Sequence, residues 1–384
     1  MQQAASGRLK WQVVDGATGE VVRDSGPDWI KNLILNAGMD EVAVKTWVDC
    51  FQYAIAGTGV TPTSVDSATT TATLSAGSVA ASAPFFSAGQ VGASIKWDDG
   101  TSGLITGYTD SQHVAVNNIL SVEAGSHFIL YNTNQTQLAS EVKRTNSYLT
   151  TTGACGSVWV GNTVQNQRTY NFSIESSPVT YTEIGFGWSS GGPNNTFSRI
   201  LLPAGVLIAV GQQLRVIYQL WVTLGPAVTT ARTAAISGWD SPTGKECIQY
   251  QGLYAVNSNG TSGGQTFSEP STGFSTANAF IGTDATAPAA FGSTVSRVGT
   301  NYYPDTVTRA AYVSGSYVVT ISLFWSVGNA VNSSLSSFGV GYYNSPPQPW
   351  QSTYYVFVFD TPQAKDSAHT LTLVLQYAWS RVLA

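Results

Sequence analysis

Apolar and polar side chains alternate along several stretches of the chain, which is the pattern of strands that bury one face. The alternation is clear at 169–174 (TYNFSI), 181–188 (YTEIGFGW) and 214–222 (LRVIYQLWV). It returns in the last part of the chain, at 317–325, 338–343, 354–359 and 371–379. Gly, Asn and Pro separate these stretches, so we expect antiparallel strands joined by tight turns, and an all-β fold.

Three short segments occur twice in the same order. The matches are AIAGT at 54–58 with AFIGT at 279–283, EIGFGW at 183–188 with SFGVGY at 337–342, and LRVIYQLWV at 214–222 with LTLVLQYAW at 371–379. Such recurrence is typical of a duplicated unit. We therefore predict two related antiparallel β-sandwich domains, at 1–225 and 236–384, joined by a linker at 226–235.

The first copy carries an extra segment that the second copy lacks. Short strand-like runs separated by polar turns fill about 86–134, which predicts a small inserted β-module. The residues before it, 57–83, are rich in Thr, Ser and Ala with few large side chains, and we expect a loop or a loosely packed strand there.

The N-terminal segment predicts a hairpin followed by a helix. At 8–23 two apolar runs flank Asp15, Gly16 and Gly19, residues that favour a short turn. Asp40 begins a run in which four apolar residues follow at helical spacing, namely Val44, Trp47, Val48 and Phe51. We expect this helix to close one end of a sandwich; docking to a partner is the alternative.

Composition supports strands and argues against several classes of function. Charged residues make up 10% of the chain and hydrophobic residues 43%, with 11 Trp, 18 Tyr and 15 Phe to bury. The net charge is −5 and there is no basic run, so we expect no binding to nucleic acid. Uncharged polar surface costs less to bury than ions do, which favours assembly with other subunits.

The cysteines and the N-terminal residues indicate a cytoplasmic site of synthesis. Cys50, Cys155 and Cys247 are odd in number and widely spaced, which favours free thiols over disulfides or a zinc site. Residues 1–10 are polar, so we expect no signal peptide. The apolar runs are only as long as strands, so we expect no membrane span.

Residues that could perform chemistry are few. The three histidines, His113, His127 and His369, have no metal-ligand spacing, and no phosphate loop or calcium loop is present. Carboxylates lie near one another at Asp98 and Asp99, but this pair precedes Gly100 and fits a hairpin turn better than a glycosidase site. We expect no enzyme activity, no cofactor and no metal.

Aromatic residues are the remaining candidates for a binding site. We expect most of them to lie in the core or in interfaces. A group beside the prolines at 346, 347 and 349 is the best candidate for an exposed interface or glycan contact: Tyr342, Tyr343, Trp350 and Tyr354.

Parts of the chain resemble bacteriophage virion proteins of the tail, collar and fibre type. The resemblance covers about residues 8–224 and rests on KNLILNAGMD at 31–40, GTGVTP at 57–62, KRTNSY at 143–148, TYNF at 169–172, TEIGFGW at 182–188, FSR at 197–199 and the strand at 211–218. The second copy lacks the FSR triplet. The resemblance implies a β-fold and a place in the virion, and it transfers no catalytic residues.

We therefore expect a structural component of a tailed-phage virion, in the neck or collar, the tail, or the baseplate and fibres. Its expected partners are other virion proteins of the portal and neck, tail or baseplate, and further copies of itself in a symmetric ring or trimer. The alternative function is a receptor-binding module that recognises host-surface glycans through exposed aromatics. A depolymerising enzyme is the third alternative.

Overall fold

The computed structural model describes residues 2–383 except 118–120, 152, 161–162, 193, 225–231, 235, 238–244, 254–278, 284–300, 331–332 and 342–352. Nearly all regular structure in this part of the chain is β, and the sheets are antiparallel apart from one short parallel pairing. The expectation of an all-β fold is confirmed.

Ten strands from the first part of the chain form the first set. They are β1 (Gln2–Asp15), β2 (Val21–Asp24), β3 (Ile30–Ile34), β4 (Tyr53–Gly57), β13 (Glu141–Thr145), β14 (Gly156–Val160), β15 (Thr163–Asn171), β16 (Val179–Gly187), β17 (Thr196–Ile208) and β18 (Gln212–Leu224). Their order is β13-β4-β16-β17-β3-β1-β18-β15-β14, with β2 paired to β1. In β18 the predicted alternation holds, since Leu214, Val216 and Tyr218 are fully buried.

Ten further strands form the second set. They are β19 (Arg232–Ala234), β20 (Ile236–Ser237), β21 (Lys245–Leu253), β22 (Ala279–Gly282), β23 (Asn301–Tyr302), β24 (Thr306–Arg309), β25 (Val318–Trp325), β26 (Ser333–Gly341), β27 (Thr353–Lys365) and β28 (Leu371–Arg381). One sheet has the order β19-β21-β27-β26-β22-β23, and the other pairings run β20-β28-β25-β24.

The two sets pair their strands in the same order. The run β4-β16-β17-β3 corresponds to β22-β26-β27-β21, and the run β1-β18-β15-β14 corresponds to β20-β28-β25-β24. Registers agree as well: Ala54 pairs with Phe186, and Ala279, its match in the repeat, pairs with Val340. This agreement is what an internal duplication predicts.

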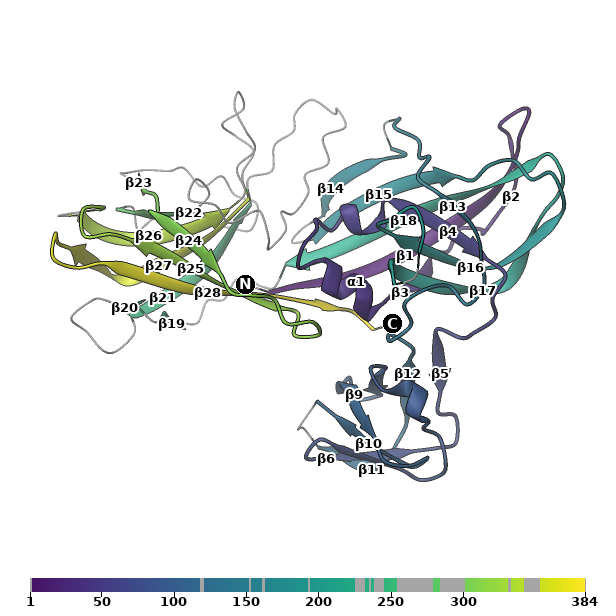
Figure 1. Ribbon diagram of the computed structural model, residues 1–384, viewed down its shortest axis with the longest axis horizontal. Helices are drawn as coiled ribbons and strands as arrows, with labels where there is room; N and C mark the ends of the chain where they lie inside the picture. The colour runs from purple at the N-terminus through teal and green to yellow at the C-terminus, as the bar shows by residue number, and fades with distance from the viewer. Residues whose placement is uncertain are drawn as a thin grey trace.

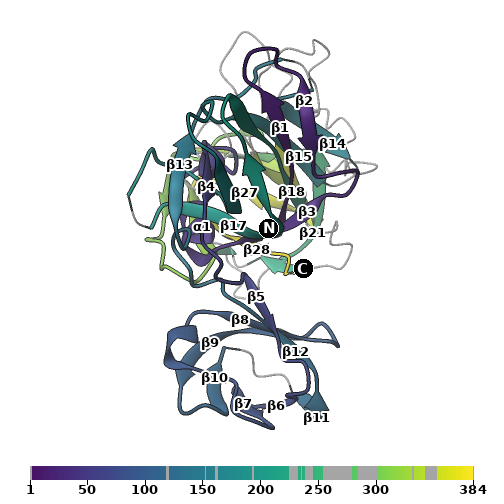
Figure 2. The same cartoon turned by 90° about the vertical axis from the view of Figure 1, so that its right-hand side faces the viewer.

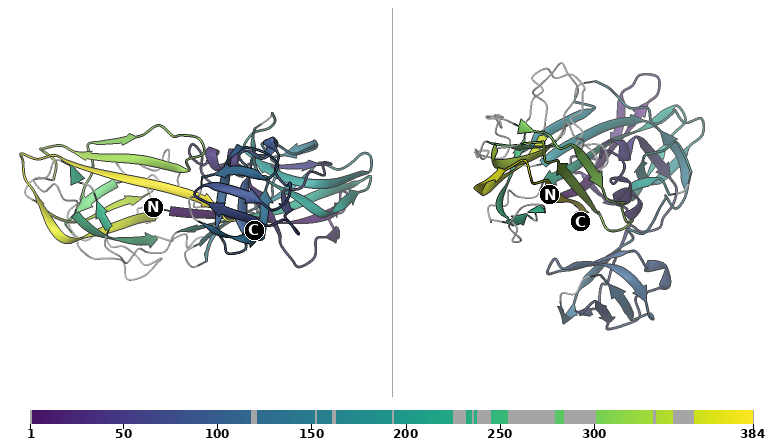
Figure 3. Two further views of the ribbon diagram at one scale, coloured as in Figure 1. Left: turned by 90° about the horizontal axis from the view of Figure 1, so that it is seen from below. Right: turned by 60° about the vertical axis from the view of Figure 1, so that its left-hand side comes forward.

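The two sets lie end to end and are joined by a short parallel pairing (Figure 3). The start of β1 pairs with the end of β28, with Gln2 opposite Ala378 and Ala5 opposite Arg381. Their buried side chains form one contiguous hydrophobic cluster, which includes Leu9 from one set and Trp325 from the other. The start of β1 and the end of β28 therefore lie side by side (Figure 1).

The inserted module is a separate eight-stranded unit that projects from the first set (Figures 1 and 2). It contains β5 (Ser64–Asp66), β6 (Ala72–Ser75), β7 (Ser78–Ala81), the 3-10 helix η2 (Ala88–Gln90), β8 (Ser94–Trp97), β9 (Ser102–Tyr108), β10 (His113–Val116), β11 (Val122–Ser126) and β12 (Phe128–Tyr131). The predicted start at about 86 is too late. The Thr- and Ala-rich residues before it are strands, because small residues such as Ala72 and Ala81 still alternate inward.

The N-terminal hairpin is confirmed, but the predicted helix after Asp40 is wrong. The structure has the α-helix α1 (Asn36–Glu41) and a 3-10 helix η1 (Asp49–Phe51), with turns between them. The Thr46 hydroxyl donates to the Asp49 carboxylate and accepts from the backbone N–H of Asp49, a local alternative to continued helical bonding. α1 packs against β17 and β28, so it lies at the junction of the two sets.

Candidate functional site

The predicted aromatic contact site stays a prediction. Tyr342, Tyr343 and Trp350 lie outside the described residues. The backbone of Tyr354 lies in β27, opposite Gly341 and Gly252, and its side chain is outside the described part.

A buried ion pair lies at the base of the inserted module. It joins Glu183 of β16 to Arg199 of the neighbouring strand β17, and both side chains are fully excluded from solvent. Arg199 donates from Nε to Oε2 of Glu183 at 2.7 Å, and its Nη2 lies 2.7 Å from the same oxygen.

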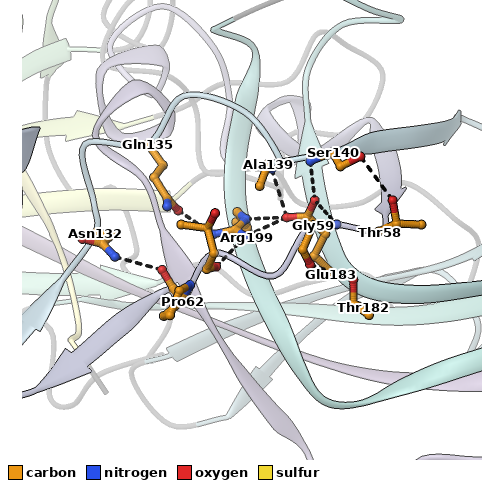
Figure 4. A network of polar contacts seen from close by, with 11 residues as sticks. Thr58, Gly59, Pro62, Asn132, Gln135, Ala139, Ser140, Thr182, Glu183 and Arg199 are labelled. Atoms are coloured by element: carbon orange, nitrogen blue, oxygen red, sulfur yellow. Dashed lines mark hydrogen bonds and ion pairs between the residues drawn. The ribbon is translucent and has the colours of Figure 1, made fainter.

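The Glu183 carboxylate also binds the two chain segments that connect the module to the first set. Its Oε1 accepts hydrogen bonds from the backbone N–H groups of Gly59 at 3.0 Å and Ser140 at 2.7 Å, and its Oε2 accepts from that of Ala139 at 3.1 Å. Gly59 follows β4 on the way out, and residues 139–140 precede β13 on the return (Figure 4). One side chain therefore holds both connections.

Arg199 binds the same two connections from the other side. Its Nη1 donates to Oε1 of Gln135 at 2.6 Å, and its Nη2 donates to the carbonyl oxygen of Thr61 at 2.7 Å. Asn132 joins the connections directly by donating to the carbonyl oxygen of Pro62 at 2.8 Å (Figure 4). We call residues 58–63 and 132–140 the stem, and the Glu183–Arg199 pair the stem clamp.

Both charges of the stem clamp can be buried because each one is paired and hydrogen-bonded on all sides. A buried ion is costly unless it is paired and its remaining donors or acceptors are satisfied. Here the carboxylate accepts from a guanidinium and three backbone amides, and the guanidinium reaches three acceptors. Loss of either partner would leave an unpaired buried charge, at a cost of about 3–5 kcal/mol.

The second set lacks this pair at the corresponding positions. Arg199 is opposite Gly185 in the first set, and Val356 is opposite Gly339, the matching glycine, in the second. By the same register Ser337 takes the place of Glu183. The second copy also lacks an inserted module in its sequence. The ion pair thus accompanies the module, which favours a positioning role over a catalytic one.

The end of β28 provides a second anchor at the base of the module. Arg381 donates to the carbonyl oxygen of Ile34 at 3.0 Å and to the side-chain oxygen of Asn36. Lys96 of the module donates to the carbonyl oxygen of Leu383 at 3.1 Å. The C-terminal residues described therefore contact the first set and the module at once.

His127 links three parts of the module. Its Nδ1 lies 3.0 Å from Oδ1 of Asp98 in the β8–β9 turn, and its Nε2 lies 2.7 Å from Oδ1 of Asp66 in β5. The hydrogen bonds to Asp98 and Asp66 raise the pKa of His127 above its ordinary value. A backbone hydrogen bond from Ala68, followed by the contact with His127, lowers the pKa of Asp66. This exposed cluster ties one edge of the module together.

The other titratable candidates sit in turns. Asp98 and Asp99 occupy the β8–β9 turn with Gly100 at a φ of 88°, as expected. His113 and His369 each contact an aspartate three residues earlier, Asp110 and Asp366. In the part of the chain that the structure describes, no group of three or more His, Cys, Asp or Glu is arranged to hold a metal ion.

Two features of the sequence point to the stem clamp. Both residues lie in motifs noted above, TEIGFGW and FSR, and the second copy lacks the FSR triplet. A charged side chain inside a strand of buried residues is a further signal, because such a charge needs a partner.

Among the described residues no helix is long and apolar enough to cross a membrane. No protein-family model, curated protein or solved structure matches the chain.

Proposed function

We propose that the chain is a structural component of a tailed-phage virion and that it holds its inserted module as a rigid projection. The stem clamp is the observation that carries this proposal. A catalytic carboxylate must reach a substrate, whereas Glu183 is fully buried and its oxygens are occupied by Arg199 and backbone amides.

The residues of the phage-like motifs support the proposal through the contacts that they make. TEIGFGW contains Glu183, FSR contains Arg199, and KNLILNAGMD contains Asn36 and Asp40. Asn36 binds Arg381 near the module, and Asp40 accepts hydrogen bonds from Tyr312 and Gly315 of the second set. These residues fix the relative positions of the parts, which is the task of a scaffold.

Low surface charge supports assembly with neighbouring subunits. Charged residues make up only 10% of the chain, and four of those in the described part, Glu175, Glu183, Arg199 and Lys365, are buried. Interfaces form more readily over uncharged polar surface, because its desolvation costs less than that of ions. The proposed neighbours are portal and neck, tail or baseplate proteins, together with further copies of this chain.

The test is the protein composition of purified phage particles whose genome encodes this chain. We expect quantitative mass spectrometry to find it at a fixed copy number that matches a symmetric ring or trimer, and immunogold labelling to place it at the neck, tail or baseplate. Absence from intact particles, or hydrolysis of polysaccharide by the purified chain, would overturn the proposal. Glycan-array binding that is lost in Trp350→Ala would instead favour the receptor-binding alternative.

A further inference from the structure

Four cations share the outward side of three neighbouring strands. Arg8 and Lys10 lie in β1, Lys31 is opposite Arg8 in β3, and Arg215 is opposite Gln12 in β18. The alternate residue Leu9 is fully buried, so the four cations point away from the core. We call this surface of β3, β1, β18 and β15 the basic face.

The basic face carries aromatic and amide groups between its cations. The Arg8 guanidinium lies 4.6 Å from the ring of Trp29 and 4.5 Å from that of Trp221, and it donates to Gln219. Gln219 donates in turn to Gln167 of β15. Trp and Arg are the residue types that anchor protein interfaces.

The cations of the basic face have no carboxylate partner among the described residues. Elsewhere each described lysine or arginine side chain contacts a carboxylate or a backbone carbonyl. No described carboxylate lies within ion-pair distance of the four cations. The outward positions of these four strands hold no Asp or Glu, whereas Asp24, at the end of β2, is opposite Gln12 of β1 and so adjoins the basic face.

The inserted module has the opposite charge. Between 64 and 131 it has five carboxylates against one lysine, a net charge of −4, whereas the whole chain has −5. All five carboxylates are exposed: Asp66, Asp98, Asp99, Asp110 and Glu123. The lysine, Lys96, is turned toward the carbonyl oxygen of Leu383. The outer surface of the module is therefore acidic.

The base of the module packs against Leu33 of β3 through Tyr131, but no described carboxylate of the module forms an ion pair with the basic face of its own chain. Figure 2 shows the module at the end of the first set opposite the β1–β2 hairpin. The clamp fixes both stem connections through buried bonds. The exposed carboxylates of the module and the four cations are therefore both available to a second copy.

We propose that the basic face binds the inserted module of a second copy of this chain. The charge complementarity between the two surfaces favours this partner. The basic face is the flat side of a sheet, which suits a protein surface better than a glycan, because small ligands need concave sites. The contact is heterologous, so repetition leads to a closed ring or an open chain of copies. The inference rests on the proposed function, for which it supplies the subunit contact.

The first test is charge reversal with rescue, read by light scattering after gel filtration. We expect the full chain to be oligomeric at low salt and to dissociate at high salt. Lys10→Glu with Lys31→Glu should weaken association by about tenfold or more, and so should Asp99→Lys with Glu123→Lys. In an equimolar mixture the native module of one variant can bind the native basic face of the other, and the two charge-reversed surfaces are also complementary. The mixture should therefore restore association, in complexes that alternate the two variants.

Lys45→Glu is the matched control, since Lys45 is a surface cation beside Glu41 and away from the basic face. It should leave association unchanged. Circular dichroism of every variant should match that of the wild type, which separates loss of contact from loss of fold.

The second test is zero-length carbodiimide cross-linking of mixed nitrogen-14 and nitrogen-15 chains. The reagent joins a lysine amine to a carboxylate only where the two touch. We expect mixed-isotope links from Lys10 or Lys31 to the module carboxylates, and their loss in the charge-reversed variants.

Two results would overturn the inference. One is a chain that stays monomeric at low salt and high concentration. The other is an oligomer that neither charge reversal affects. If the monomer bound polygalacturonate, and Lys10→Glu with Lys31→Glu abolished that binding, the basic face would be a site for an acidic glycan instead. The composition of virions, which tests the proposed function, is measured independently of these results.

Discussion

The indole Nε1 of Trp379 donates a hydrogen bond to the carbonyl oxygen of Met39 at 2.7 Å, although 340 residues separate them. Tyr312 stacks on the same indole at 5.6 Å between ring centroids, and its hydroxyl donates to Asp40 at 2.6 Å. α1 is therefore held by buried contacts from the second set as well as from the first. α1, which differs from the helix predicted after Asp40, thus connects the two sets.

Trp379→Phe tests this connection. The variant keeps an aromatic ring against Tyr312 but leaves the Met39 carbonyl without its donor, at an expected cost of about 1–3 kcal/mol. Calorimetry should show a lower melting temperature. Trp221→Phe is the control, because Trp221 is only partly buried and its indole donates to Gln219 on the surface of the sheet. It should change stability by less than about 0.5 kcal/mol, and an equal effect of both variants would contradict the prediction.

Removal of one partner of the stem clamp should release the stem. In Arg199→Met the buried carboxylate of Glu183 keeps its backbone donors but loses its counter-ion. The expected loss is about 3 kcal/mol, or roughly a hundredfold faster hydrogen exchange at the Gly59 and Ser140 amides. Mass spectrometry of deuterated peptides measures this change directly.

A double variant provides the control for the clamp. Glu183→Ser with Arg199→Val places the residues of the second set, Ser337 and Val356, at the clamp positions. It removes both charges, so the remaining fold should be more stable than in Arg199→Met, while the stem amides still exchange rapidly. Unchanged protection at Gly59 in both variants would show that the clamp does not hold the stem.

Gly59→Ala should disturb the same site through its size. A Cβ atom at this position would lie 2.3 Å from Oε1 of Glu183 and 2.6 Å from Cβ of Ala139. We expect a loss of about 1–3 kcal/mol, because the carboxylate must move away from its donors. Gly89→Ala is the matched control, since a Cβ atom at Gly89 meets nothing within 4 Å. Chemical denaturation gives the free energy of unfolding of each variant for this comparison.

The His127 cluster should make the stability of the module depend on pH. The pKa of His127 is raised above its ordinary 6.5, so its contribution is complete below pH 6.5 and is lost as the pH rises through the folded value. The pKa of Asp66 is lowered below 3.8, so its contribution is present above pH 3.8 and is lost in more acidic solution. We expect the module to be most stable between these limits.

Two measurements check the pH dependence. Proton NMR titration should give His127 a pKa above 6.5, and the melting temperature of the module should fall as the pH rises through that value. His127→Gln should remove this fall and change the acid side only in part, because the backbone hydrogen bond from Ala68 is the larger cause of the lowered pKa of Asp66. A pKa of 6.5 or less for His127 would contradict the prediction.

Alternation and turn residues were sufficient to predict the β-fold. The turn after Asp15 was predictable because its Oδ1 accepts from the amides of Ala17 and Thr18 and Gly19 has a φ of 76°, a conformation that glycine readily adopts. The start of the module was not, because Ala72 and Ala81 are too small to give a clear apolar pattern. The run from Val44 to Phe51 has helical spacing, yet Thr46 and Asp49 bond to each other instead.

The stem clamp was only partly predictable. The sequence marks Glu183 and Arg199 as members of motifs, but their pairing depends on the register between β16 and β17. Their contacts with Gly59, Ser140 and Gln135 depend on how the chain leaves and re-enters the first set. Such long-range contacts leave no local pattern in the sequence, since they are set by the packing of distant segments.

The parallel pairing of Gln2–Ala5 with Ala378–Arg381 has a consequence for biosynthesis. The ribosome makes the start of β1 more than 370 residues before it makes the partner segment in β28. Until then the early segment keeps an open hydrogen-bonding edge, which in other proteins invites mispairing with a neighbouring nascent chain. Completion of this sheet must therefore wait for synthesis of the end of β28, and slow elongation or crowded polysomes should favour aggregation through this edge.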